Sequence, residues 1–402
     1  MAHRGGVTGK EVNKKEFISR INAKYTAPIS AFSKRTRGIA LVAKAGEKKE
    51  EKQEKDKPAF DRIIDYYRHL LTRAEPTPKE SSARGFIARE LYTLLFGGIE
   101  SDLAGKSDLV IIPGGVLAFV PFETLIMPDG RYLAEKYNIK YTQSLTVSGI
   151  IEKRAYGPDR KEMIAFGGAV YYEEQYKAVM ITSEGQLKSI IVALNRGEDA
   201  RRAYADLGYT WSNLPGTLVE VKAIRSLMED TVVYTGDTVT KTHFQEMSKR
   251  GDLQKYKVIH LATHGLVTPE APELSAVVFS QFKNPRPGDD GYLRAGEILG
   301  LALKADFVNL SACETGLGKL YSGEGVVGLT QSFLIAGANG LSVSLWSVAD
   351  ESTTEFMAGM YTLVTKKGMT YDRAMVEMKR RFIAHTKWNN PYYWAPFVYY
   401  GK

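Results

Sequence analysis

The sequence predicts an α/β fold in which a mainly parallel β-sheet is covered by helices on both faces and preceded by a short helical lead-in. Two observations predict this fold. Apolar residues recur at helical spacing between residues 60 and 95, and beyond residue 109 short β-rich runs alternate with helical stretches through short connections. Alternating strands and helices are typical of a parallel sheet with both faces covered.

The helical lead-in consists of two amphipathic segments. Apolar side chains recur every three or four positions in residues 60–71 and again in residues 87–95, and Pro76 and Pro78 separate the two runs. After them the apolar period shortens. Strands are expected at residues 109–112 and 139–141.

The rest of the chain alternates between the two kinds of element. Strands are expected at residues 163–166, 231–234, 258–262, 276–279, 307–310 and 341–345. Helices are expected at residues 217–228, 240–248, 295–301, 325–335, 351–365 and 371–385. The tyrosine-rich residues 391–401 are interpreted as a final strand that seals the sheet, in preference to a surface that stacks on bases.

The composition excludes several classes of protein. With 44% hydrophobic and 25% charged residues, the chain is neither largely disordered, nor collagen-like, nor embedded in a membrane. One cysteine cannot form an intramolecular disulfide, and the first twenty residues lack a secretory signal, so we expect a cytoplasmic location. No apolar run approaches the ~18–20 residues that span a bilayer, so no membrane partner is expected.

The net charge is concentrated at the N-terminus. The chain carries a formal charge of +8, and residues 1–44 hold ten bases and two acids, which is the whole excess. The balanced remainder argues against a protein whose main surface binds nucleic acid. Residues 47–57 hold ten charges, five of each sign, and are interpreted as a solvated helix or a linker. We therefore divide the chain into an arm and linker, residues 1–58, and a domain, residues 59–402.

Two of the expected strands end in reactive residues. His264, followed by Gly265, comes after the strand at 258–262, and Cys313 comes after the strand at 307–310. If these strands are parallel neighbours, both side chains emerge at one edge of the sheet. An imidazole there can take the thiol proton, and the backbone N–H groups of Gly265 and Cys313 can hold an oxyanion. The residues alone also allow a buried structural cysteine and a structural histidine.

Neither a metal site nor a cofactor is expected. His260, His264 and Cys313 lack further ligands, and the H-x-x-x-H spacing is typical of metal sites on helices, whereas this segment has strand composition. His260 is interpreted as a core histidine that lies beneath the site and supports His264. The glycines of residues 323–328 lack the lysine of a phosphate-binding loop and are expected to allow tight helix packing.

Several sequence blocks follow one another in a specific order between residues 87 and 402. They are LVIIPGGVLAFVPFE (109–123), LPGT (214–217) followed by Glu220, YTG (234–236), HLATHG (260–265), LSACETGLG (310–318), GEGVVGLTQSFLIAGANGLSVSLWSVAD (323–350) and PYYWAPFVYYG (391–401). This pattern resembles the CHAT domain of bacteria, a caspase- and separase-like cysteine peptidase domain. The resemblance implies a caspase-like fold for about residues 87–402. It does not cover the arm, the charged run or the first helix, so the helical lead-in at residues 59–107 is predicted from the apolar pattern.

The resemblance also implies a mechanism. Cys313 is the expected nucleophile and His264 the general base and acid of an endopeptidase that works through a thioester, with no acidic third member. Asp350 stands where a separase-like acid faces the P1 side chain, which would favour a P1 arginine or lysine. Alternatively, or in addition, Asp350 caps the following helix. Glu314 either lines the pocket or stabilises its own loop.

The resemblance implies partners as well. We expect a specific protein substrate, an activating protein partner and a role in bacterial defence or cell death. CHAT domains usually follow tetratricopeptide repeats, and no 34-residue repeat is visible here. The alternatives are a catalytically silent interaction module with this fold and a hydrolase of another acyl substrate.

Three interpretations of the basic arm stay open. It is a flexible tail that binds an acidic partner or nucleic acid, a helix that packs on the body through Val12, Ile18 and Ile21, or a segment that the protein itself cleaves after lysine or arginine.

Overall fold

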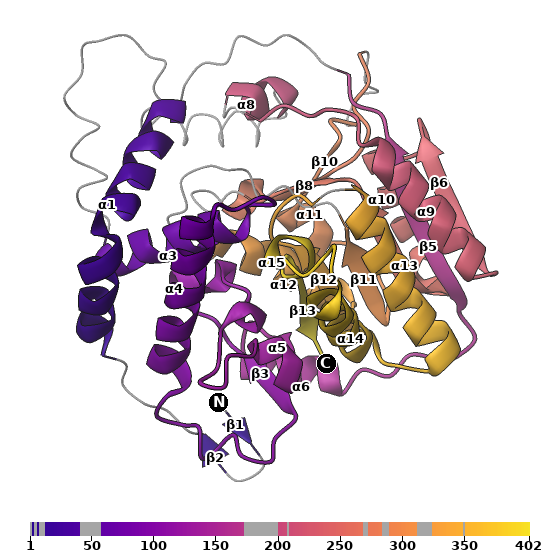
Figure 1. Cartoon of the computed structure of the whole chain (residues 1–402). Coiled ribbons are helices and arrows are strands. Elements are labelled where there is room, and N and C mark those ends of the chain that lie inside the picture. Colours follow the sequence, from indigo (N-terminus) through magenta and orange to yellow (C-terminus); the bar gives the residue numbers. More distant parts are fainter. Residues whose placement is uncertain are drawn as a thin grey trace.

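The structure is a computed structural model. It describes residues 2–3, 6–7, 13–40, 58–172, 200–206, 209–267, 272–283, 289–311, 324–348 and 350–402. The charged run at 47–57, Cys313 and Glu314 lie outside these residues. Figure 1 shows a central sheet with helices packed around it and three helices of the N-terminal part side by side at one end.

An eight-stranded sheet forms the centre, with the strand order β3-β4-β13-β12-β11-β7-β5-β6. The strands are β3 Asp108–Ile111, β4 Asn138–Tyr141, β5 Lys161–Ala169, β6 Thr231–Gly236, β7 Tyr256–Ala262, β11 Phe307–Leu310, β12 Gly340–Ser344 and β13 Phe397–Gly401. All neighbouring strands are parallel except β12 and β13. The prediction of a mainly parallel sheet is confirmed. Because β13 is also parallel to β4, the strands β3, β4 and β13 run opposite to the other five.

Helices cover both faces of this sheet. The helices that follow the arm are α3 Ala59–Leu71, α4 Pro78–Phe96, α5 Leu133–Lys136, α6 Leu145–Glu152, α8 Ala200–Asp206, α9 Pro215–Leu227, α10 Lys241–Lys249, α11 Ala295–Leu299, α12 Glu324–Ala336, α13 Asp350–Lys367, α14 Tyr371–Ala384 and α15 Pro391–Trp394. His260 of β7 contacts Tyr361 of α13, whereas Phe166 of β5 contacts Phe244 of α10. His260 pairs with Ala165, and successive side chains on a strand alternate between faces, so α13 and α10 lie on opposite faces.

A second, smaller sheet lies beside the first. Its strands are β8 His264–Leu266, β9 Ala276–Val278 and β10 Tyr292–Arg294, in the order β10-β9-β8 and all antiparallel. The expectation that residues 276–279 continue the strand series of the main sheet is therefore wrong. These strands have three residues each, and their apolar pattern alone cannot tell which sheet they join.

The predicted C-terminal strand is confirmed for residues 397–401, whereas residues 391–394 form the helix α15, and the strand seals no edge. β13 lies inside the main sheet between β12 and β4, and all five of its residues are buried. Its neighbours come from residues 138–141 and 340–344, so the pairing joins segments far apart in the sequence. Both faces of β13 are covered, which explains its continuous run of apolar and aromatic residues.

The basic arm contains a long helix, α1 Lys14–Ala40, and the first interpretation of the arm is wrong for residues 14–32. The side chains of Phe17, Ile21, Tyr25 and Ile29 are buried, and α1 packs on α3 and α4 (Figure 1). A kink at Tyr25, with φ −129° and ψ 18°, precedes Pro28, which has no N–H for a helical hydrogen bond. The arm is thus part of the helical lead-in over these residues. A short hairpin, β1 Ala2–His3 with β2 Gly6–Val7, precedes it.

Candidate active site

The two strands that lead to the candidate residues are parallel neighbours, which is the condition for both residues to emerge at one edge of the sheet. β7 and β11 pair directly, with Leu261 opposite Leu310. The next residue after β11, Ser311, donates its backbone N–H to the carbonyl of Leu261 over 3.0 Å. His264 follows β7 as the first residue of β8, and Cys313 follows Ser311 by two positions in the sequence but lies outside the described residues.

His264 has a defined orientation inside the protein. Only 1% of its surface is exposed, and its Nε2 lies 2.7 Å from the carbonyl oxygen of Ser212. A carbonyl oxygen accepts hydrogen bonds and cannot donate them, so Nε2 carries the proton. In the neutral imidazole the lone pair is therefore on Nδ1. Nδ1 is the atom that can act as a base.

Two aromatic side chains hold the imidazole ring. The ring of Tyr171 meets it edge to face at a centroid distance of 4.7 Å, and the ring of Trp211 lies 5.0 Å away. The backbone N–H of His264 donates to the hydroxyl of Tyr171 over 3.3 Å, and this hydroxyl donates to the carbonyl of Val278 over 2.8 Å. These contacts shield the imidazole from water and fix its ring plane.

The segment that orients His264 precedes α9 and was not found by sequence reasoning. Trp211 and Ser212 contact the imidazole directly, and the side-chain oxygen of Asn213 accepts the backbone N–H of Tyr171 over 2.8 Å. The only signal in the sequence is the aromatic pair of Tyr209 and Trp211 directly before the LPGT block. Such a pair carries no helical or strand periodicity, and its partner lies about 50 positions further along the chain.

His260 is a core histidine, as predicted. Its ring is fully buried, with Nδ1 3.0 Å from the hydroxyl of Tyr361 and 3.1 Å from Nδ2 of Asn309. Its Nε2 lies 3.1 Å from Oε1 of Glu220 on α9. The hydroxyl of Ser311 donates to the same carboxylate oxygen over 2.5 Å. Through Glu220, His260 thus reaches the end of β11, and in the part of the chain that the structure describes its polar contacts connect it to Ser311 rather than to His264.

A glycine lets α9 bring Glu220 into this network. A Cβ atom on Gly167 of β5 would lie 2.7 Å from the carbonyl oxygen of Thr217 and 2.7 Å from a methyl group of Val221. Such contacts are too short for any side chain. The hydroxyl of Thr217 also accepts the backbone N–H of Gly168 over 2.9 Å, which fixes the start of α9 against β5.

The remaining predicted site residues are placed only in part. Gly265 lies in β8, directly after His264, and pairs with Val277. Asp350 is the first residue of α13, and its side chain lies outside the described residues, as do Cys313 and Glu314. The structure therefore gives no distance between His264 and Cys313. Among the helices that it describes, none is both long and apolar enough to cross a membrane.

A family model described as the CHAT domain matches residues 86–402. The chain belongs to the CHAT domain family. Two curated proteins match it as well: tetratricopeptide repeat protein 28 of mouse is 24% identical over 351 residues, and its human counterpart is 23% identical over 351 residues. Each alignment covers 78% of this chain, which spans only 13% of the length of these relatives.

Two solved structures resemble the CHAT domain chain at low sequence identity. The Saccharomyces cerevisiae separase–securin complex matches with 10% identity and a TM-score of 0.41, over 98% of this chain and 23% of the other. The Arg-specific cysteine proteinase gingipain R matches with 9% identity and a TM-score of 0.40, over 88% of this chain and 75% of the other.

Proposed function

We propose that this CHAT domain is a cysteine endopeptidase in which His264 activates Cys313. The observation that carries the proposal is the orientation of His264. Its Nε2–H is engaged by the Ser212 carbonyl, which leaves Nδ1 as the basic atom at the end of β7. β11, the parallel neighbour of β7, leads within three residues to the single cysteine of the chain.

The mechanism follows from these roles. Nδ1 of His264 takes the proton of the Cys313 thiol as the sulfur attacks the carbonyl carbon of the scissile peptide bond. The backbone N–H groups of Gly265 and Cys313 stabilise the oxyanion. His264 then donates the proton to the leaving amine, and a thioester remains on Cys313. Water, deprotonated by the same Nδ1, attacks the thioester carbonyl, the C–S bond breaks to release the acid, and the imidazolium returns its proton to the Cys313 thiolate.

The Ser212 carbonyl has a second role in this mechanism. While His264 holds the additional proton, its ring is positively charged and buried against Tyr171 and Trp211. A carbonyl oxygen 2.7 Å from Nε2 places partial negative charge beside this imidazolium. A backbone carbonyl thus fills the position that an acidic side chain holds in a triad.

The proposal is tested by cleavage of a peptide library. The purified wild-type chain and the Cys313→Ala variant are incubated with peptides derived from a proteome, and new N-termini are identified by mass spectrometry. We expect a set of cleavages that only the wild-type chain produces. Cleavages that persist unchanged in Cys313→Ala would contradict the proposed nucleophile.

We propose further that Asp350 selects a basic P1 residue. The Asp350→Asn variant is expected to lower cleavage after arginine or lysine by about 10- to 100-fold, because a charge-assisted hydrogen bond is replaced by a neutral one. Asparagine caps helices as well as aspartate does, so the start of α13 is retained. Glu351→Gln, which removes the exposed carboxylate of the next residue, is the matched control for loss of a negative charge. Unchanged cleavage after arginine in Asp350→Asn would assign this residue to capping alone.

An activating protein partner remains part of the proposal. The relatives of this chain are named for tetratricopeptide repeats, and repeats of this kind form surfaces that bind other proteins. We expect the rate of peptide hydrolysis by this chain to rise when the activating protein partner is bound.

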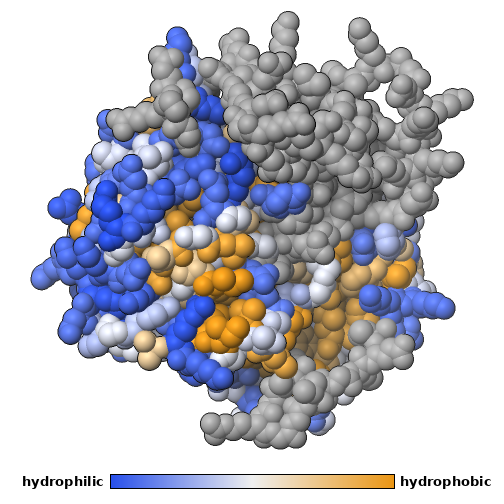
Figure 2. Space-filling model, turned by 180° about the vertical axis from the view of Figure 1, so that it is seen from behind, coloured by the Kyte–Doolittle hydropathy of each residue, from blue (hydrophilic) through white to orange (hydrophobic). Residues whose placement is uncertain are grey.

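An interaction module is the second candidate function, and the molecular surface favours it. Figure 2 shows apolar side chains gathered near the middle of the rear face, and Leu145, Ile150 and Ile335 are large apolar side chains about half exposed. Apolar areas on a surface often bind other proteins. For a silent module, neither the wild-type chain nor Cys313→Ala would cleave any peptide, and the library experiment separates the two functions.

A further inference from the structure

Tyr292 and His264 lie on the same small sheet. In the register of β8, β9 and β10, both residues pair with Val278 of the central strand, one from each side. Residues directly opposite each other in antiparallel strands project to the same face. The side chains of His264 and Tyr292 therefore share one face of this sheet, with the width of β9 between them.

Trp211 bridges the two residues across that face. Its ring lies 5.0 Å from the imidazole of His264 and 6.4 Å from the ring of Tyr292. Its indole Nε1–H donates to the hydroxyl of Tyr292 over 2.8 Å. The residue after Trp211 is Ser212, whose carbonyl accepts the Nε2–H of His264. The hydroxyl of Tyr292 thus fixes Trp211. The next residue, Ser212, sets the tautomer of the His264 imidazole.

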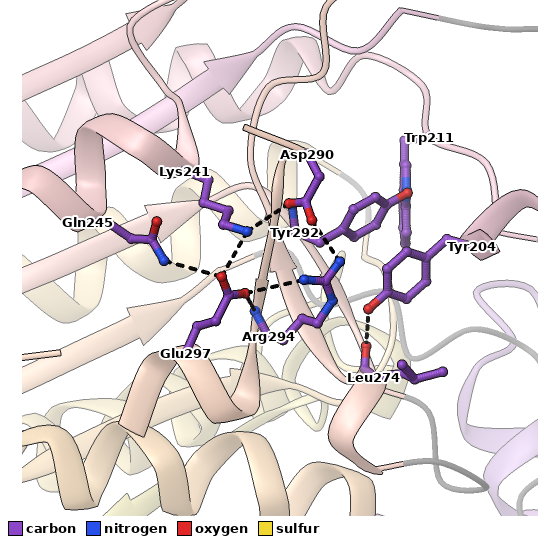
Figure 3. Close-up of polar contacts among 9 residues, drawn as sticks. All are labelled: Tyr204, Trp211, Lys241, Gln245, Leu274, Asp290, Tyr292, Arg294 and Glu297. Carbon is purple, nitrogen blue, oxygen red and sulfur yellow. Dashed lines mark hydrogen bonds and ion pairs between the residues drawn. The ribbon is translucent and has the colours of Figure 1, made fainter. Parts of the chain in front are cut away.

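Tyr292 is itself firmly held (Figure 3). Its ring stacks on that of Tyr204 at 3.9 Å, and its backbone N–H donates to the carboxylate of Asp290 over 2.9 Å. Asp290 forms ion pairs with Lys241 and Arg294, at 2.9 and 2.7 Å. Both cations also pair with a second carboxylate, that of Glu297.

The state of the hydroxyl does not change in neutral solution. Burial raises the pKa of Tyr292 to about 12. The hydroxyl therefore stays protonated and uncharged over the pH range in which a thiol–imidazole pair is active. Only 1% of the Tyr292 surface and 7% of the Trp211 surface are exposed. Water cannot readily replace the hydroxyl as the acceptor of the indole N–H, so loss of the hydroxyl leaves a buried donor without its partner.

We propose that Tyr292 is a positioning residue for His264 and acts through Trp211. The catalytic consequence rests on the proposed function, but the orientation of His264 can be measured without it. Tyr292→Phe removes the hydroxyl and keeps the stacked ring. The freed indole turns toward another acceptor, Ser212 moves with it, and the preference of His264 for a proton on Nε2 is weakened.

The experiment uses the full chain labelled with ¹⁵N-histidine. The ring nitrogens are observed by NMR, and the signals of His264 are assigned with the His264→Gln variant. We expect a single tautomer with the proton on Nε2 in the wild type. In Tyr292→Phe the two nitrogen shifts should move toward each other as both tautomers are populated. Peptide hydrolysis should fall about tenfold in kcat, with KM changed less than about twofold.

Tyr204→Phe is the matched control. Tyr204 belongs to the same aromatic stack, and its buried hydroxyl donates to the carbonyl of Leu274 over 2.9 Å rather than to Trp211. This variant loses a comparable hydrogen bond and should keep the wild-type shifts of His264. Equal changes in both variants, or wild-type shifts in Tyr292→Phe, would overturn the proposal.

A second variant keeps the test decisive if Tyr292→Phe does not fold. Trp211→Phe leaves no unpaired indole N–H but removes the bridge, and it should also populate both tautomers. A single wild-type tautomer in Trp211→Phe would overturn the proposal as well. If the wild-type chain cleaves no peptide, the proposed function fails, while the NMR measurement still decides whether Tyr292 positions His264.

Discussion

Replacing His264 by alanine is expected to lower peptide hydrolysis by at least about 100-fold, since a positioned general base and acid contributes ~10²- to 10⁴-fold to the rate. The loss should appear in kcat, because the imidazole moves protons in the transition state and contributes little to binding of the ground state. The measurement is the steady-state hydrolysis of the best peptide from the library.

The control for this variant is His385→Ala. His385 is an exposed histidine that directly follows α14 and lies outside the site. It should retain wild-type hydrolysis. A His264→Ala variant within threefold of the wild type would exclude His264 as the general base.

Lys379→Met is expected to have the largest effect on stability. Lys379 of α14 and Glu123 form an ion pair in which both side chains are almost fully buried, with exposed fractions of 2% and 1%. The other carboxylate oxygen of Glu123 accepts the hydroxyl of Tyr141 over 2.5 Å. Burial lowers the pKa of Lys379, opposed by the charge of Glu123. Removing the cation leaves a buried carboxylate without its counter-ion, and the free energy of unfolding should fall by roughly 3–5 kcal/mol.

Two further variants serve as comparisons for Lys379→Met, and the stability of all three variants is measured by urea-induced unfolding. Arg381→Met removes an exposed ion pair with Glu377 on the same helix and should change the free energy of unfolding by less than about 1 kcal/mol. The double variant Lys379→Met with Glu123→Leu removes both charges and should recover much of the lost stability. A single Lys379→Met variant as stable as Arg381→Met would contradict this prediction.

The main sheet could be predicted from the sequence because its strands are covered on both faces. Strands such as β7 and β11 read as short apolar runs between polar turns, and this pattern is independent of where each strand lies in the sheet. The order of the strands could not be predicted in the same way. β13 enters the sheet between β12 and β4, and its pairing depends on contacts between residues more than 50 positions apart.

The helical arm shows a different limit. Basic residues dominate the charge of α1, and a basic terminus is usually a solvated tail. Its buried side chains, Phe17, Ile21, Tyr25 and Ile29, recur every four residues. A period of four is typical of a helix. Pro28 lies within the run, however, and proline has a very low helix propensity, so propensity argues against a continuous helix here.

The candidate site was predicted from two residues at strand ends together with the resemblance to the CHAT domain, and the residues that surround His264 were not predicted. His264 and Cys313 stand at strand ends, where reactive side chains are expected. Ser212 acts through its backbone carbonyl, and the identity of a residue does not indicate what its backbone accepts. Tyr292 belongs to a three-residue strand in the second sheet, which the sequence pattern did not reveal. The contact of Ser212 with His264 and the contact of Tyr292 with Trp211 each join residues far apart in the sequence, so both arise from tertiary packing.

The pH dependence of Cys313 alkylation tests the account most directly. The chain has one cysteine, so the mass shift produced by iodoacetamide reports on Cys313 alone. We predict that the wild-type thiol reacts at pH 7 at least about tenfold faster than the thiol of His264→Ala, whose rate should rise only near pH ~8.5, the pKa of a free cysteine. His385→Ala should follow the wild-type curve. Superimposable curves for the wild type and His264→Ala would contradict the claim that His264 activates Cys313.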